Sequence, residues 1–283
     1  MKDKLQSFIL LSVLSGISVL LFYPFFSELN TYWQHERESS YVVLIPLFSV
    51  YFLWVQREKL RGLQFNREES FFSNGGLVLL IFGLGLFIIG RYTYVLFAEA
   101  LAFVVVIAAA VLFIYGRDLF KITLVPILFL LFMLPIPYPI YFAVAGPLKY
   151  FIAYMAATLL SFMRIPVFLE GNVINLTSIT LLVHETCSGL RTVISLLAIS
   201  TAFAYLFLKS YRSWIAIIAA AVIVGIFVNV IRIFGIGLLS YMYDSTVAME
   251  FHKYAWGLVT PAGVIAIFMI GYILRWYEER RDT

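Results

Sequence analysis

The sequence predicts an all-α polytopic membrane protein with about eight transmembrane helices. Apolar residues make up 63% of the 283 positions and charged residues only 13%, about half the charged share of soluble domains. The apolar residues also form blocks close to the ~20 residues that a spanning helix needs. The basic residues behind the net charge of +4 cluster in short segments between these blocks, which indicates topology and argues against nucleic-acid binding.

Each predicted span is an apolar block of suitable length. The blocks are Leu5–Phe26, Tyr41–Gln56, Gly75–Gly90, Val95–Tyr115, Leu119–Pro135, Ser188–Leu208, Trp214–Ile236 and Tyr254–Trp276. The first follows Lys2 and Lys4 and lacks a small-x-small cleavage site. We therefore expect a retained helix there and not a signal peptide.

The basic residues also predict the orientation, because cytoplasmic loops carry an excess of lysine and arginine. The first loop, SELNTYWQHERESS, is acidic on balance and falls outside. With the N-terminus inside, the cytoplasmic segments contain Arg57, Lys59, Arg61, Arg67, Arg117, Lys121, Lys209, Arg212, Arg275, Arg280 and Arg281. Both termini are therefore predicted to be cytoplasmic.

One further apolar block, Tyr138–Met163, does not fit this alternation. If it spanned, the three following helices would turn their basic loops outward, so we expect an extracytoplasmic interfacial helix. A ninth span is the alternative. The next segment, RIPVFLEGNVINLTSITLLVHE, has β-branched residues and a Gly-Asn turn and predicts a short β-hairpin or three short strands. Because unpaired strand backbone cannot face lipid, residues 138–183 are predicted to form an extracytoplasmic insertion within a single domain over 1–283.

Three chemically reactive side chains arrive at one predicted depth. Cys187, the only cysteine, directly precedes the sixth span, and its neighbours Ser188 and Gly189 suggest an exposed helix start. Arg232 is expected in the last turn of the seventh span, which runs outward, and His252 just before the eighth. We therefore expect the three to meet on the extracytoplasmic side.

This set suits cysteine-dependent acyl transfer. A thiolate is the nucleophilic form of cysteine, and a helix N-terminus or nearby cations, here Arg191 and Arg232, favour it. Arg232 can stabilise an oxyanion, and His252 can act as acid or base. The chemistry implies no metal and no organic cofactor.

Each residue also has a purely structural interpretation. A lone cysteine is often a small buried apolar residue, and an arginine at a helix C-terminus is favoured by the dipole alone. His252 can be a loop residue at the interface. Against this, the segment around Arg232 is apolar apart from Asn229, and an arginine within a span costs about 2.5–3.5 kcal/mol to insert.

Five further polar residues are candidate supports. His184 and Glu185 either orient the site or are polar loop residues. Arg191 lies one turn after Cys187, and pairing with Glu185 as a structural bridge is its alternative role. Asn229 shares a helix face with Arg232. Glu99, within an apolar block, supports the site or pairs with a neighbouring span.

The motifs around these residues resemble the exosortase/archaeosortase family. The resemblance is carried by ETCSGLR around Cys187, NVIRI around Arg232 and HKYAWG around His252, in that order. Supporting matches are SSYVVLIPLFSVYFLWVQREKL, MLPIP and RIPVFLEGNVINL, so that the similarity covers about residues 30–275. In the third residue of this set, His252, the chain resembles the bacterial branch of the family.

The resemblance implies a transpeptidase of the plasma (inner) membrane whose site faces the periplasm. Such enzymes cleave C-terminal sorting tails of secreted proteins, composed of a short motif, often Pro-Glu-Pro, a transmembrane helix and a basic cluster. Cys187 would be the nucleophile, with Arg232 and His252 as partners. The acceptor is not identified.

The sequence is also compatible with two other functions. Intramembrane arginine, asparagine and glutamate can line the path of a transporter or flippase. A non-catalytic factor of exopolysaccharide export would carry Cys187 incidentally. The polar residues gather at one face and not at mid-depth, which favours the enzyme.

Overall fold

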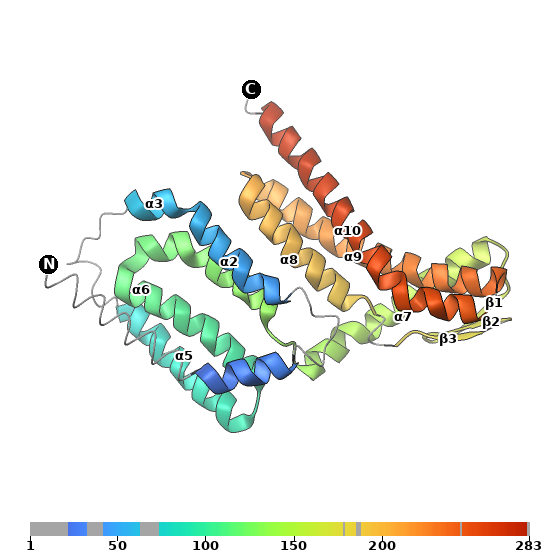
Figure 1. The fold of residues 1–283 in the computed structure, drawn as a ribbon, viewed down its shortest axis with the longest axis horizontal. Helices are drawn as coiled ribbons and strands as arrows, with labels where there is room; N and C mark the ends of the chain where they lie inside the picture. The colour runs from blue at the N-terminus through green and yellow to red at the C-terminus, as the bar shows by residue number, and fades with distance from the viewer. Residues whose placement is uncertain are drawn as a thin grey trace, which may run out of the picture. The chain divides into compact units, whose positions relative to one another are not determined.

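The computed structural model describes residues 22–32, 42–62, 74–177, 179–184, 188–243 and 245–281. The chain forms two compact units, Met1–Ile136 and Pro137–Thr283. Figure 1 shows that helices dominate both of them. All three residues of the predicted site belong to the second unit by sequence. A single domain over 1–283 stays a prediction.

The first unit is a bundle of apolar helices. Its described elements are a helix over 22–32, α2 (Leu44–Val55), α3 (Arg57–Gly62), α5 (Asn74–Thr93), α6 (Leu96–Phe129) and the 3-10 helix η2 (Leu130–Met133). Within α6, Gly116 has a non-helical backbone with φ of 80° and ψ of −173°. This break separates the two spans predicted on either side of it, and only glycine adopts such a conformation readily.

An ion cluster joins three helices of this unit. Arg91 Nη1 donates a hydrogen bond to Glu28 Oε1 and lies 3.8 Å from Glu99 Oε1. The Glu99 side chain is fully buried, and neither of its oxygens has a hydrogen-bond partner among the described residues. Glu99 therefore pairs with a neighbouring helix, as one of the two predictions had it, and the cluster has one more carboxylate than guanidinium.

The second unit is built around one long helix. Its elements are α7 (Tyr138–Phe162), β1 (Val167–Glu170), β2 (Val173–Leu176), β3 (Thr180–Leu182), α8 (Leu190–Phe207), α9 (Tyr211–Met242) and α10 (Ser245–Arg281). Helices α7, α8 and α10 all pack against α9. Glycines permit close approach, since a Cβ at Gly225 would lie 2.7 Å from Val193 and one at Gly237 2.8 Å from Leu160.

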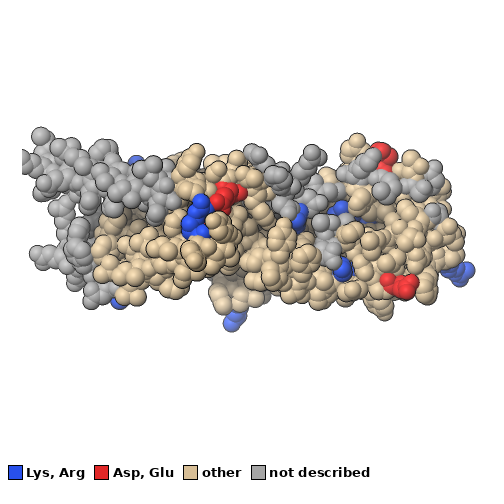
Figure 2. All heavy atoms as spheres, turned by 90° about the horizontal axis from the view of Figure 1, so that it is seen from below, with Lys and Arg blue, Asp and Glu red and all other residues tan. Residues whose placement is uncertain are grey.

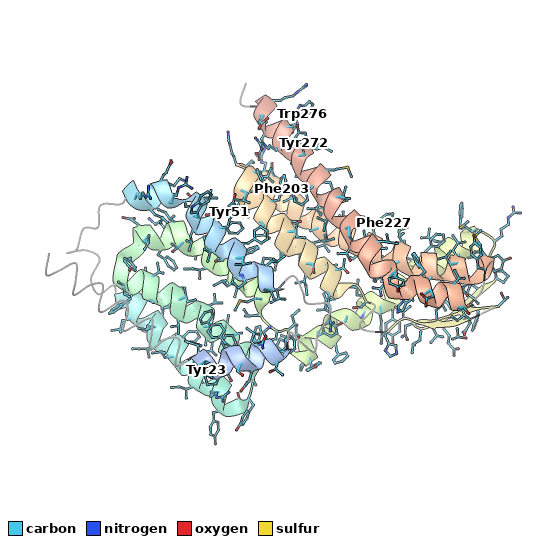
Figure 3. All side chains as sticks on the ribbon, in the orientation of Figure 1. Tyr23, Tyr51, Phe203, Phe227, Tyr272 and Trp276 are labelled. Atoms are coloured by element: carbon cyan, nitrogen blue, oxygen red, sulfur yellow. The ribbon has the colours of Figure 1, made fainter. Side chains whose placement is uncertain are left out.

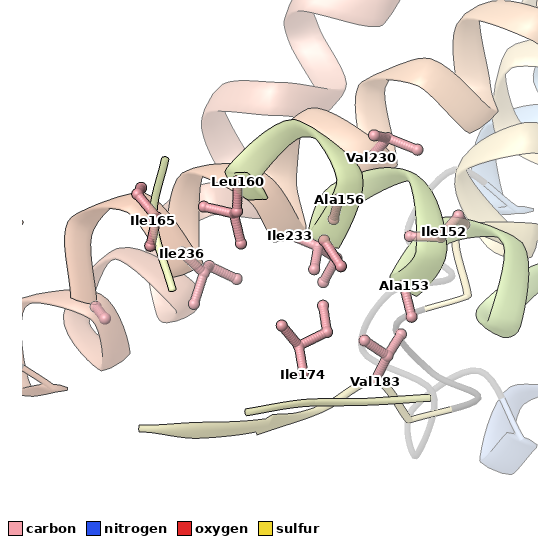
Figure 4. Close-up of a cluster of buried hydrophobic side chains, with 12 residues drawn as sticks. Ile152, Ala153, Ala156, Leu160, Ile165, Ile174, Val183, Val230, Ile233 and Ile236 are labelled. Carbon is pink, nitrogen blue, oxygen red and sulfur yellow. The ribbon is translucent and has the colours of Figure 1, made fainter. Parts of the chain in front are cut away.

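The strands form an antiparallel sheet in the order β1-β2-β3. Three strands, and not a two-stranded hairpin, are thus the correct form of the predicted β segment. The turn between β1 and β2 uses Gly171 at φ +63°, as the Gly-Asn signal predicted. One face of the sheet covers a buried apolar cluster, to which Ile174 and Val183 contribute beside α7 and α9 (Figure 4).

The surface of the described helices is suited to lipid. Large apolar side chains such as Phe227, Tyr272 and Ile273 are more than half exposed, and the first two are labelled in Figure 3. In the face seen in Figure 2, charged residues are few and scattered. Six described helices have the length and composition to cross a membrane, with α6 and η2 counted as one. This confirms an all-α polytopic membrane protein.

The first span lies mostly outside the described residues, and α2, with 12 residues, is shorter than the block predicted there. Helix α7 confirms a helix over the block at 138–163, and it has the length and apolarity of a span. Its position at the extracytoplasmic interface stays a prediction.

The tight contact between α8 and α10 gives a stability prediction. A Cβ at Gly271 would lie 2.4 Å from the Phe203 ring, whereas one at Gly257 of the same helix meets nothing within 4 Å. Gly271→Ala should lower stability by about 1–3 kcal/mol through overpacking, and Gly257→Ala should be neutral or stabilise by up to ~1 kcal/mol. Thermal unfolding in detergent measures both, and equal melting temperatures would refute this packing.

Candidate functional site

The predicted site is organised by the middle of α9. Arg232 lies ten residues before the end of this helix at Met242, so its predicted place in a last turn is wrong. The helix continues because its apolar residues go on packing against the sheet and α7. The dipole acts only within the last turn and therefore does not account for an arginine here.

Arg232 is buried in apolar surroundings. Only 7% of the residue is exposed, and Val230, Ile233 and Ile236 on the same helix belong to the apolar cluster below the sheet. Within the described parts of the chain, Arg232 Nε has no hydrogen-bond acceptor. A buried donor without an acceptor costs about 1–3 kcal/mol, and more when charged. Such a group is well suited to receive an oxygen acceptor from outside the chain.

Asn229 connects Arg232 to the start of α8. It lies one turn before Arg232 and is 1% exposed. Gly189, directly before α8, has φ +74°, and a Cβ there would lie 2.8 Å from Asn229 Cγ and Nδ2. Ser188 is fully buried and its Oγ accepts a 3.5 Å hydrogen bond from Leu190 N–H. The expected exposed helix start is therefore wrong, because Ser188 and Gly189 are both buried and Gly189 packs against α9.

Val183 precedes the cysteine segment, residues 185–187, and is held against the same stretch of α9. Val183 is 1% exposed and belongs to the apolar cluster with Val230 and Ile233. Its N–H donates to Asn172 O at 3.0 Å, and Asn172 Nδ2 donates to Val183 O at 2.9 Å. Both flanks of residues 185–187 are thus held against α9, while Cys187 and Glu185 themselves lie outside the described residues.

His252 is helical. It lies in the first third of α10, before the stretch Gly257–Arg281 that has the character of a span. The alternative of a loop histidine is therefore wrong. The neighbouring Phe251 packs close to Gly235, whose Cβ would lie 3.2 Å from the Phe251 ring. Because Gly235 is one turn after Arg232, the start of α10 runs beside the Arg232 stretch.

The remaining predicted supports differ in their surroundings. Arg191 lies in the first turn of α8, with its Cζ 5.8 Å from the ring centroid of Tyr141 on α7. That cation–π contact is one the sequence analysis missed, and the predicted Arg191–Glu185 pair involves a residue that is not described. His184 is exposed at the end of the sheet. The part of the chain that the structure describes contains no group of three His, Cys, Asp or Glu residues able to hold a metal.

The geometry brings three segments together on α9: the flanks of the cysteine segment, the Asn229–Arg232 turn and the first turns of α10. Residues 33–271 match the family model described as transmembrane exosortase. The chain belongs to the transmembrane exosortase family. No curated protein and no solved structure matches it. Exosortases are in general membrane cysteine transpeptidases that sort proteins, so membership supports such an activity at the level of the family.

Sequence reasoning missed the residues that create this geometry. Gly235 and Tyr141 were assigned no role in it, and Gly189 was interpreted only as a sign of an exposed helix start, although glycine directly after Cys-Ser is a signal for a positive φ. Gly235 gave no comparable signal, because its importance comes from the neighbouring helix. Contacts between helices distant in sequence do not follow from local pattern.

The contact between Gly189 and Asn229 can be tested directly. Gly189→Ala should reduce substrate processing by the exosortase by about 10–100-fold, because a Cβ would both strain the positive φ and displace the segment from α9. Gly146→Ala in α7 is the matched control, since a Cβ there meets nothing within 4 Å. Processing is followed by the change in substrate size on a gel. Equal processing by the two variants would contradict the role of Gly189.

Proposed function

We propose that this exosortase is a cysteine transpeptidase that cleaves C-terminal sorting tails of secreted proteins and transfers the secreted portion to an acceptor. Cys187 is the nucleophile, and Arg232 and His252 are its catalytic partners. The main support is the close packing of Gly189, two residues after Cys187, against Asn229, one turn from Arg232.

Covalent geometry adds to this support. Consecutive Cα atoms are 3.8 Å apart, so the Cα atoms of Cys187 and Gly189 are at most about 7.6 Å apart. Gly189 packs on the Asn229 side chain, and Asn229 and Arg232 share one face of α9. Arg232 therefore lies one helical turn from the residue on which the segment after Cys187 packs.

The proposed reaction has two steps. The Cys187 thiolate attacks the carbonyl carbon of the scissile peptide bond, the C–N bond breaks, and His252 donates a proton to the leaving amine. The secreted portion stays attached as a thioester. An amine, a hydroxyl or water then attacks the thioester carbonyl and gives its proton to His252, the C–S bond breaks, and the Cys187 thiolate is regenerated. The reaction involves no metal and no organic cofactor.

Arg232 is the proposed oxyanion partner. Its Nε lacks an acceptor within the described structure and is buried, so a developing negative charge nearby gains a donor that requires little reorganisation. Electrostatic stabilisation of this kind is worth roughly 2.7–4 kcal/mol for one donor. Asn229, Arg191, Glu185 and His184 are proposed to position the site.

The proposed substrate partners are secreted proteins that end in a short motif such as Pro-Glu-Pro, a transmembrane helix and a basic cluster. The site would face the periplasm, with both termini in the cytoplasm. The excess of lysine and arginine in the segments predicted to be cytoplasmic supports this orientation.

Replacement of the cysteine tests the proposal. Cys187→Ala should abolish processing of a reporter protein that carries a genome-encoded tail of this architecture, because no other thiol is available in the chain. Immunoblotting of the full-length and cleaved reporter measures the result. Cys187→Ser, which keeps the size of the side chain, controls for packing and should also be inactive. A transporter or scaffold would keep its function in both variants, and processing by Cys187→Ala would refute the enzyme proposal.

Arg232 offers a second test that separates catalysis from stability. Arg232→Met removes a buried charge from an apolar site, so the melting temperature in detergent should be unchanged or higher. Processing should nevertheless fall by at least about 100-fold. If Arg232 were structural, activity and melting temperature would fall together.

A further inference from the structure

We propose that strand β3 is the docking edge for the substrate, and that the extended segment around the scissile bond pairs with it as a fourth strand. This rests on the proposed function and names how the same site holds its peptide. Among the described residues, the strand order β1-β2-β3 leaves one long side of β3 without a neighbouring strand.

The hydrogen-bond pattern of the sheet shows which groups of β3 are free. Leu176 N–H donates to Ile179 O at 2.9 Å and Val183 N–H donates to Asn172 O at 3.0 Å. Ile174 lies opposite Leu181. The hydrogen-bonded pairs are therefore Ile179 with Leu176, Leu181 with Ile174, and Val183 with Asn172. In an antiparallel ladder the alternate residues direct their main-chain groups away from the partner strand. The N–H and C=O groups of Thr180 and Leu182 therefore point to the open edge.

These groups have no main-chain partner among the residues that the structure describes. Both residues are also exposed, with Leu182 at 50%. Thr180 Oγ1 donates to Asn175 Oδ1 at 3.0 Å, which fixes the side chain to β2 and away from the edge. The opposite face of the sheet is occupied by the apolar cluster. With respect to the part of the chain that the structure describes, this edge of β3 is thus both polar and accessible.

An extended peptide matches this edge better than other occupants. The main-chain N–H and C=O groups of Thr180 and those of Leu182 lie about 6.6–6.8 Å apart along β3, which is also the spacing of alternate residues in an extended peptide. A strand of three residues is too short to hold a second copy of the chain by itself. It is long enough to align a peptide that is held elsewhere. A protease or transpeptidase needs such an extended, unpaired main chain at its nucleophile.

The position of β3 in the chain supports the same occupant. The strand leads through Val183 directly into the segment that contains Cys187, and Val183 is clamped by two hydrogen bonds to Asn172. A peptide paired with Thr180 and Leu182 would therefore lie along the strand that leads to the nucleophile. Alternate substrate residues would face the exposed surface of the sheet, where Leu182 and Phe168 lie.

The test removes one edge donor and keeps the fold. Leu182→Pro deletes an N–H that points away from β2, a position that an edge strand tolerates. Leu182→Val shortens the same side chain and retains the N–H. Leu182→Pro should process the tail reporter at least about five-fold more slowly than Leu182→Val does. This is the factor that one hydrogen bond of ordinary net strength supplies. Equal rates in two folded variants would overturn the proposal.

A crosslinking experiment covers the case in which Leu182→Pro fails to fold. The photoreactive residue p-benzoyl-phenylalanine replaces Leu182 or, as the matched control, Phe168, which is 66% exposed on the opposite edge strand. Both are made in the full-length Cys187→Ala chain and illuminated with the same tail reporter. An adduct at 182 that exceeds the one at 168 is expected, and no adduct at 182, or an equal one at 168, overturns the edge. Failure of the proposed function would instead appear as processing by Cys187→Ala itself.

Discussion

The burial of Arg232 in the middle of α9 is the constraint around which the second unit is arranged. An arginine in an apolar span is costly, and its Nε lacks an acceptor among the described residues. The surrounding packing is nevertheless close, with α7, α8, α10 and the sheet all on the same helix. A buried, charged donor without an acceptor in such close packing is what the proposed role of Arg232 as an oxyanion partner requires.

Small residues make this arrangement possible. Gly189, Gly225 and Gly237 lie where α8, the segment before it and α7 meet α9, and a Cβ at any of them would come within 3 Å of a neighbour. In a bilayer such close contacts replace the hydrophobic effect as the source of helix association. The same contacts that stabilise the unit therefore also set the distance between the cysteine segment and Arg232, so that stability and geometry depend on one set of residues.

Local pattern was sufficient for the elements but not for their ends and contacts. Apolar blocks predicted the helices, and Gly171 with β-branched neighbours predicted the strands. The sequence could not show that α9 continues ten residues past Arg232 or that His252 lies inside a helix, because packing against distant segments extends both helices beyond the apolar core of the predicted spans. The Gly235–Phe251 and Gly189–Asn229 contacts could likewise not be predicted from the sequence, since each joins residues that meet only when the helices pack.

The small size of the sheet has a consequence for how a substrate is held. Two hydrogen-bonded pairs on β3 give weak binding alone, whereas a tail helix in the same membrane confines the adjoining peptide and raises its effective concentration at the site. Affinity would then come from the bilayer, and the sheet would contribute alignment with the nucleophile. With this division, a short edge beside the segment with Cys187 would be adequate for the proposed transpeptidase, because the edge would only have to select a conformation of a peptide that the membrane already delivers.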